Sequence, residues 1–174
     1  MKGVSRCVGV VLVGVAALTS AQVPAVVDTS GWKVLREEAL GFQLKHPPTW
    51  RVGRSTGTLE SVLLREPDEA GPARVSMQIL VQRGINPQGL TIEQWYLDQL
   101  RRLKVAAPPP TTTTVIGGRP TIVRLLSRPD GPRYDYYTAV NASDVLQVSI
   151  TQSTPEARLD RTHEAVLSSI TLVK

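Results

Sequence analysis

Residues 111–151 read TTTTVIGGRPTIVRLLSRPDGPRYDYYTAVNASDVLQVSIT, and this stretch decides the fold. Three turn signals divide it: Gly117-Gly118, residues 129–132 (PDGP) and residues 141–144 (NASD). The segments between them are rich in β-branched and aromatic residues, which favour strands. Turns this short connect antiparallel neighbours, because a parallel connection needs a dozen or more residues. The stretch therefore predicts consecutive antiparallel strands over 111–116, 119–127, 133–141 and 145–151.

Upstream of this stretch, shorter segments also favour strands. Residues 32–38 and 41–45 are separated from residues 50–52 by a Pro-Pro-Thr turn that cannot continue a β-ladder. Residues 59–66 and 74–82 alternate apolar and polar side chains, with Val75, Met77 and Ile79 on one face. A turn over 68–72 connects these two strands.

Two helices complete the predicted secondary structure. Thr91 followed by Gln94 matches a capping box, and an apolar stripe then continues to about residue 105. A second helix is predicted to begin in residues 153–156 (STPE), which combine a hydroxyl cap, a proline and an acidic first turn. Many short strands and only two helices predict an α+β fold, in which helices flank a central antiparallel sheet.

The N-terminus has the order of a secretory signal peptide. Lys2 and Arg6 precede an apolar run over 8–18, which is followed by the small residues of 19–21. The run is shorter than the ~20 apolar residues of a membrane span. We expect cleavage near Ala21, a flexible lead-in over 22–30, a single domain over 31–174 and a secreted or periplasmic location, with no stable membrane span in the mature chain.

Charge and cysteine content argue against nucleic-acid binding and against sites that need a cysteine. The chain has 174 residues, with 20 Lys and Arg against 15 Asp and Glu. Removal of residues 1–21 leaves 18 basic against 15 acidic residues, and the basic residues are scattered, so no nucleic-acid partner is expected. The single cysteine, Cys7, lies in the predicted signal peptide, so the mature chain is predicted to have no disulfide and no thiolate site.

Several motifs resemble the PsbP-like family. Residues 41–52 (GFQLKHPPTWRV) match a family pattern in which Gly-Phe-x-apolar leads to a proline and, three residues later, a tryptophan. The helix at 91–103, the hairpin entry at 116–120 (IGGRP) and the ending 167–170 (LSSI) also fit. The resemblance implies an α/β/α sandwich. It also implies a mostly non-enzymatic role, because the family consists of extrinsic photosystem subunits and secreted bacterial relatives. The lead-in lacks the basic arm of the photosystem subunits.

No motif in the sequence predicts catalysis, a metal or a cofactor. His46 precedes the Pro-Pro turn and His163 lies on the apolar seam of the second helix, and neither has a ligand at metal-site spacing. There is no Gly-x-Ser-x-Gly elbow and no Gly-rich loop that opens a helix. We therefore predict no catalytic, cofactor-binding or metal residues.

A group of aromatic residues on one strand is the candidate interaction surface. Tyr134 and Tyr136 alternate with Asp135 and Tyr137, so the two pairs point to opposite faces. Tyrosine and arginine are favoured at interface centres, which makes Arg133, Tyr134 and Tyr136 the candidate surface. The more economical alternative is that the tyrosines are β-favouring residues that fill the space beneath a helix.

We therefore expect a secreted or periplasmic, non-catalytic module that binds a protein or assembly partner, or a small ligand. Two alternatives make distinct demands on the structure. A hydrolase or metal-dependent enzyme requires His46 or His163 to converge with carboxylates in a cleft. A carrier of a small hydrophobic ligand requires an enclosed apolar cavity of at least ~300 Å³.

Overall fold

The computed structural model describes residues 26–55, 59–67, 75–129, 131–153 and 159–173. The predicted signal peptide over 1–21, its cleavage near Ala21, residues 22–25 of the lead-in and the turn over 68–72 lie outside the described residues. Among the described residues, no helix is long and apolar enough to cross a membrane.

A large antiparallel sheet holds most of the described chain. Its strands are β3 (Arg51–Ser55), β4 (Ser61–Arg65), β5 (Val75–Gln82), β6 (Thr111–Ile116), β7 (Arg119–Leu126), β8 (Arg133–Ala139) and β9 (Val145–Gln152). They are arranged in the order β3-β4-β5-β9-β8-β7-β6. Gly117 and Gly118 have φ values of 58° and 75°, the conformation that a two-residue hairpin requires. The predicted antiparallel run of four strands is confirmed.

A second, three-stranded sheet consists of β1 (Lys33–Glu37), β2 (Phe42–His46) and β10 (Thr171–Leu172), in the order β1-β2-β10. Pro47 and Pro48 end β2, and the Trp50 amide closes the turn on the Pro47 carbonyl at 3.1 Å. The chain therefore leaves this sheet before β3 begins in the large one. It returns only at β10, which pairs with β2 across almost the whole sequence.

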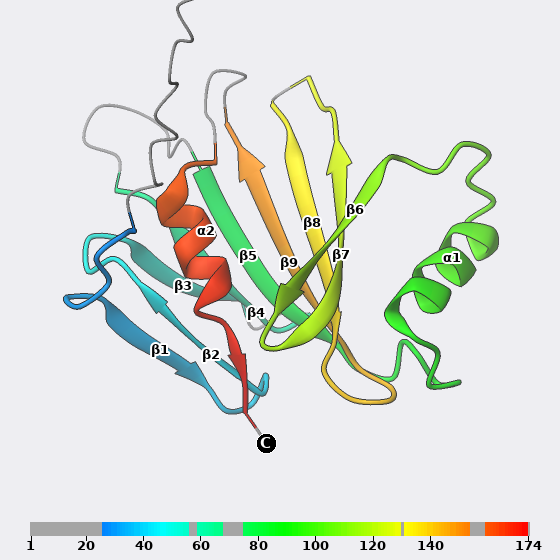
Figure 1. The fold of residues 1–174 in the computed structure, drawn as a ribbon, viewed down its shortest axis with the longest axis horizontal. Coiled ribbons are helices and arrows are strands. Elements are labelled where there is room, and N and C mark those ends of the chain that lie inside the picture. Colours follow the sequence, from blue (N-terminus) through cyan, green and yellow to red (C-terminus); the bar gives the residue numbers. More distant parts are fainter. Residues whose placement is uncertain (1–25, 56–58, 68–74, 130, 154–158, 174) are drawn as a thin grey trace, which may run out of the picture.

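The main core lies between the two sheets. The small sheet and helix α2 (Arg161–Ser168) cover one face of the large sheet, and Figure 1 shows both in front of it. Phe42 and Leu44 of β2 are buried against this face, as are Val166 and Ile170. The large sheet contributes the alternate residues that point the same way, which include Leu64, Met77, Ile79, Leu146 and Ile150.

Helix α1 (Ile92–Arg102) packs on the opposite face of the large sheet, mainly over β7 and β8. The predicted capping box is confirmed, because Thr91 and Gln94 exchange side-chain to backbone hydrogen bonds. The helix buries Ile92, Trp95, Tyr96 and Leu100 against Ile122, Tyr137 and Val145. In the described part of the chain, no helix lies over the β3–β4–β5 side of this face (Figure 1).

The second helix begins later than the sequence pattern predicted. Its N-cap is Asp160, whose Oδ1 accepts hydrogen bonds from the amides of Thr162 and His163 at 2.8 and 3.2 Å. The predicted start at 153–156 is therefore wrong for α2, although residues 154–158 lie outside the described part. An aspartate at this position satisfies two free amides of the first turn, which makes it a strong N-cap.

The predicted fold class is also wrong. Strands make up 45% and helices 14% of the described residues, in two antiparallel sheets, so the protein has a β-rich fold instead of an α+β sandwich with flanking helices. The expectation of one central sheet fails because β1, β2 and β10 form a layer of their own. That layer covers much of the apolar surface that a helix was expected to cover.

Candidate functional site

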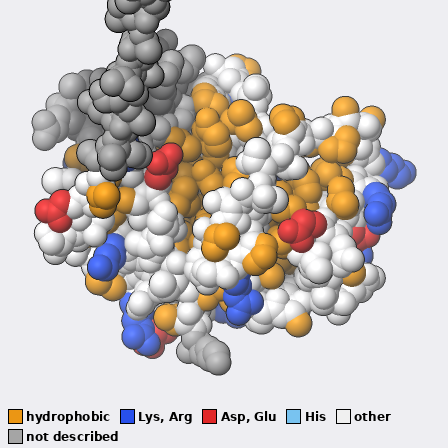
Figure 2. Space-filling view, viewed as in Figure 1, with side chains coloured by type: hydrophobic (Ala, Val, Ile, Leu, Met, Phe, Trp, Pro, Cys, Tyr) orange, Lys and Arg blue, Asp and Glu red, His pale blue; other side chains and the backbone are white. Residues whose placement is uncertain are grey.

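An open groove of about 610 Å³ lies between α2 and the strands β6, β7 and β8. Figure 2 shows apolar side chains gathered in a hollow on this face. The groove is lined by residues of three regions: Thr112, Thr114, Val115 and Ile116 of β6; Val123, Tyr134 and Tyr136 of β7 and β8; and Leu159, Glu164, Leu167 and Ser168 at α2. Because it opens to the surface, it is not the enclosed cavity that a hydrophobic-ligand carrier requires.

Two of the three predicted interaction residues form the floor of this groove. Tyr134 and Tyr136 lie two residues apart on β8 and point to the same side, and Tyr136 stands opposite Val123 of β7. Tyr136 is 9% exposed, and its burial raises the pKa of the phenol to about 12. The Tyr136 phenol therefore stays protonated and uncharged at any physiological pH.

Arg133, the third predicted residue, lies on the opposite face of the sheet. Its Nε donates to Asp135 Oδ1 at 2.7 Å and its Nη2 donates to Ser149 Oγ at 2.9 Å. Asp135 is completely buried, and its other oxygen accepts from Arg124 Nη2 at 2.6 Å. Arg133 therefore belongs to a hydrogen-bonded network next to α1, and the structure does not bring it together with the two tyrosines.

The outer edge of β6 lies beside the groove. Thr111 to Val115 are exposed, and β6 is an edge strand of the large sheet. In a two-residue hairpin the residues next to the turn form a hydrogen-bonded pair, and such pairs alternate along the ladder. Ile116, Thr114 and Thr112 therefore bond to β7. The backbone N–H and C=O groups of the intervening residues, Thr111, Thr113 and Val115, point outward from the sheet.

This edge lacks the usual protection against pairing with another strand. Exposed edges are commonly blocked by charged side chains, prolines or bulges. The opposite edge of the sheet, β3, has Arg51 and Arg54. In contrast, β6 has four threonines, a valine and an isoleucine, and no charge or proline. Among the described strands of this sheet, β6 is thus the edge that best accepts an additional strand.

The two histidines lie in separate settings. His46 Nδ1 is 2.8 Å from the Pro47 carbonyl oxygen. His163 is 1% exposed, and its ring lies 5.2 Å from the Trp50 ring. Its Nδ1 atom is 2.8 Å from Asp160 Oδ1, and its Nε2 atom is 3.3 Å from Glu66 Oε1. The Nε2 contact lacks hydrogen-bond geometry. Burial alone would raise the pKa of Asp160, but hydrogen bonds from His163 and Thr162 hold it below its ordinary value.

His163 and its two carboxylates do not form an accessible catalytic arrangement. The ring is closed off from solvent, and within the described residues no serine or threonine hydroxyl is hydrogen-bonded to it. Asp160 is already occupied as the N-cap of α2. Glu66, Asp160 and His163 are near enough to share a cation, since one ligand atom from each lies within 4.8 Å of the others. The N-cap bonds of Asp160 and the burial of His163 give this group of three residues a structural role at the start of α2.

Several groove residues were missed in the sequence. The sequence predicts a strand over 111–116 but does not indicate that its threonines line a groove, and it does not single out Leu167. The Gly117-Gly118 hairpin held the signal for β6, because its two-residue turn determines which backbone groups point outward. No sequence signal places α2 across from β6, since that contact joins segments about fifty residues apart.

Comparisons with known proteins give a likeness in fold. No family model matches the chain, and no curated protein matches it, so the PsbP-like resemblance stays a prediction. One similar solved structure is a crystal structure from Bacteroides thetaiotaomicron VPI-5482, with a TM-score of 0.52 and 15% sequence identity. The match covers 77% of this chain and 46% of that one, so this chain spans less than half of its length. At this identity the likeness concerns the fold alone.

Proposed function

We propose that this protein is an exported, non-catalytic binding module whose ligand is an extended segment of another polypeptide. The segment pairs with the outer edge of β6 and places alternate apolar side chains in the groove between β6 and α2. The signal-peptide pattern of residues 1–21 supports the export part of the proposal. The observation that carries the binding part is an unprotected β-edge beside a groove with apolar residues in its lining.

The chemistry of the two surfaces specifies an extended peptide. Outward N–H and C=O groups on Thr111, Thr113 and Val115 match the repeat of a β-strand, in which alternate residues bond to one neighbour. In β-strand addition, these main-chain bonds supply affinity and adjacent pockets select alternate side chains. The groove lined by Val123, Tyr134 and Tyr136 is such a pocket. Its lining also includes Val115, so the groove extends to the edge strand β6.

Selection from a display library of random ten-residue peptides tests the proposal. We expect the enriched peptides to have apolar residues at alternate positions. Synthetic copies should bind in fluorescence anisotropy and lose binding when alternate amides are N-methylated, because methylation removes the donors along one peptide edge. Failure to enrich any such pattern, or undiminished binding of the methylated copies, would contradict strand addition.

Two variants of one residue provide the matched comparison. Thr113→Pro removes an outward N–H and leaves the bonds to β7 intact, whereas Thr113→Val retains the N–H and changes only the side chain. We expect the proline variant to bind the peptide about tenfold more weakly, because this factor corresponds to the free energy of one hydrogen bond near the upper end of the usual range. The valine variant should bind as tightly as the wild type. Equal binding by both variants would place the peptide elsewhere.

A further inference from the structure

The opposite side of the large sheet carries a second hollow, of about 580 Å³, over β3, β4 and β5. Helix α1 packs mainly over the β7–β8 end of this face, so the hollow lies open. Its lining includes Arg51, Gly53, Ser55, Leu63, Arg65 and Gln78. From this hollow we infer a binding site for a small hydroxylated oxyanion, such as a sugar carboxylate or a sugar phosphate. The inference is independent of the proposed peptide groove.

Two arginines stand directly opposite each other at one end of the hollow. Arg51 of β3 and Arg65 of β4 are register partners, so their side chains leave the same face, and both residues are exposed. Neither forms an ion pair or a hydrogen bond with any residue in the described part of the chain. Like charges placed opposite in an antiparallel pair are destabilising. An anion bound in the hollow would offset the positive charge of this pair.

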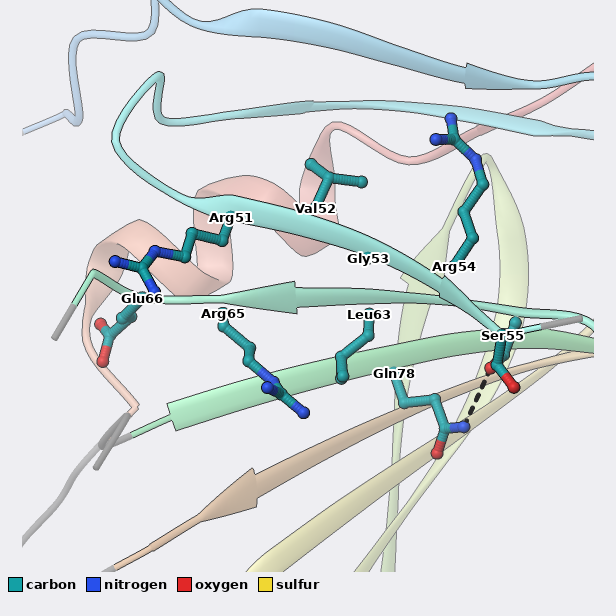
Figure 3. A pocket seen from close by; sticks show the side chains of 10 residues that line it. Arg51, Val52, Gly53, Arg54, Ser55, Leu63, Arg65, Glu66 and Gln78 are labelled. Carbon is teal, nitrogen blue, oxygen red and sulfur yellow. Dashed lines mark hydrogen bonds between the residues drawn. The ribbon is translucent and has the colours of Figure 1, made fainter.

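The other charged groups nearby are arranged differently. Figure 3 shows Glu66 at the rim of the hollow, where its Oε1 lies 3.3 Å from the buried His163 Nε2 without hydrogen-bond geometry. Arg54 points to the other face of β3, where its Nε donates to Glu37 at 3.0 Å. On the same face as the hollow, Arg124 and Arg133 share the Asp135 carboxylate. Of the arginines that line the hollow, Arg51 and Arg65 have no acidic partner among the described residues, whereas Arg54 pairs with Glu37.

Gly53 makes room beside the arginine pair. It lies two residues after Arg51, on the same face and opposite Leu63. A β-carbon at Gly53 would meet Leu63 only at 3.9 to 4.0 Å, which is ordinary contact, so the fold does not require glycine here. Glycine in the middle of a strand weakens it and often marks the close approach of a ligand. The missing side chain leaves Leu63 as an open apolar floor.

The far end of the hollow offers neutral hydrogen-bonding groups. Gln78 Nε2 donates to Ser61 Oγ at 3.1 Å, and Ser55 stands opposite Ser61 in the register (Figure 3). This bond leaves the Gln78 carbonyl oxygen and the hydroxyl group of the exposed Ser55 available to a ligand, whereas Ser61 is buried. Alternate residues of a strand are about 7 Å apart, so a ligand anchored at the arginines extends over Gly53 toward these groups. Guanidinium groups at one end and neutral polar groups at the other fit an anion with a hydroxylated body.

Isothermal titration calorimetry with four sugars and with inorganic phosphate tests the inference. The sugars are the anionic galacturonate and glucose 6-phosphate and the neutral galactose and glucose. We expect at least one anionic sugar to bind and its neutral counterpart not to bind. The two anionic probes distinguish a carboxylate from a phosphate ligand. Absence of binding by both anions at millimolar concentration would overturn the site, and so would equal binding of the neutral sugars. Inorganic phosphate that binds as tightly as the sugar anions would overturn the role of the hydroxylated body.

Variants separate the charge of the site from its shape. Arg51→Gln and Arg65→Gln should each weaken anion binding about tenfold or more, whereas Arg36→Gln, the same change on the small sheet, should leave it within about twofold. Gly53→Ala should weaken binding without loss of stability. Arg65→Gln should also raise the melting temperature of the ligand-free protein, because it removes the like-charge pair. Unchanged binding in both arginine variants would overturn the site, whatever their stability.

Discussion

Arg124 and Asp135 stand opposite each other on β7 and β8, and Arg124 Nη2 donates to Asp135 Oδ2 at 2.6 Å beneath the end of α1. The carboxylate is fully buried, and its second oxygen accepts from Arg133 and Ser149. A buried charge with this many partners becomes costly when one partner is removed, because the remaining charges stay desolvated. The network is therefore a sensitive point of the large sheet.

Asp135→Asn should lower the free energy of unfolding by about 3–5 kcal/mol, the usual cost of breaking a buried pair. Asp98→Asn is the matched control. Asp98 pairs with Arg102 one turn away on the exposed side of α1, at 2.7 Å, and such pairs contribute only about 0.3–0.5 kcal/mol. Urea denaturation measures both variants. Equal losses in the two would show that burial of Asp135 is unimportant.

The same network predicts a pH dependence. Burial alone would raise the pKa of Asp135, but hydrogen bonds from Arg124, Ser149 and Arg133 outweigh it and hold the pKa below its ordinary value. A group whose folded pKa is depressed stabilises the fold above its unfolded pKa and loses that contribution as the pH falls. The stability difference between wild type and Asp135→Asn should therefore be constant at neutral pH and shrink below about pH 4. A difference that stays constant down to pH 2.5 would contradict this assignment.

Proline scanning of β6 checks the phase of its hydrogen bonds without any ligand. Thr113→Pro should change stability little, because the N–H of Thr113 points away from β7. Thr114→Pro should cost at least about 0.5–1.5 kcal/mol more, since it removes a ladder bond. Thermal or urea unfolding of the two variants gives the comparison. The reverse order would mean that the two-residue hairpin is offset by one residue.

The β6–β7 hairpin turn should show unequal sensitivity at its two glycines. Both have positive φ, so alanine is strained by about 1–2 kcal/mol at either position. A β-carbon at Gly117 would also meet Leu172 Cγ at 3.3 Å and the Ile170 carbonyl oxygen at 3.5 Å, whereas one at Gly118 would meet nothing within 4 Å. Gly117→Ala should therefore destabilise the protein more than Gly118→Ala. Equal losses would indicate that the turn is not held against β10.

Much of the candidate groove could be anticipated from local sequence, and some of it could not. The alternation of residues 133–137 predicted that Tyr134 and Tyr136 share a face, and they do. The alternation did not show on which face of the sheet the groove lies. The candidate surface also included Arg133, which directly precedes Tyr134 on the strand and points to the opposite face. Adjacent residues on a strand point to opposite faces, so Arg133 could have been separated from Tyr134 by the same rule.

The features that could be predicted from the sequence alone depend on interactions between residues close in the chain. Two glycines in a row predicted the β6–β7 hairpin, and Thr91 with Gln94 predicted the start of α1, because turn and cap energies depend only on neighbouring residues. The alternation of apolar residues in β5 likewise marked the face that the core buries.

The tertiary structure decided how these elements divide into layers. β10 pairs with β2, α2 lies across from β6, and Arg65 stands opposite Arg51. Each of these depends on how two pieces of chain pack, and apolar faces of similar size can be covered in more than one way. The hydrophobic effect is non-directional, so local patterns predicted that the apolar face of the large sheet would be covered. Only the assembled chain showed that a second sheet covers much of it.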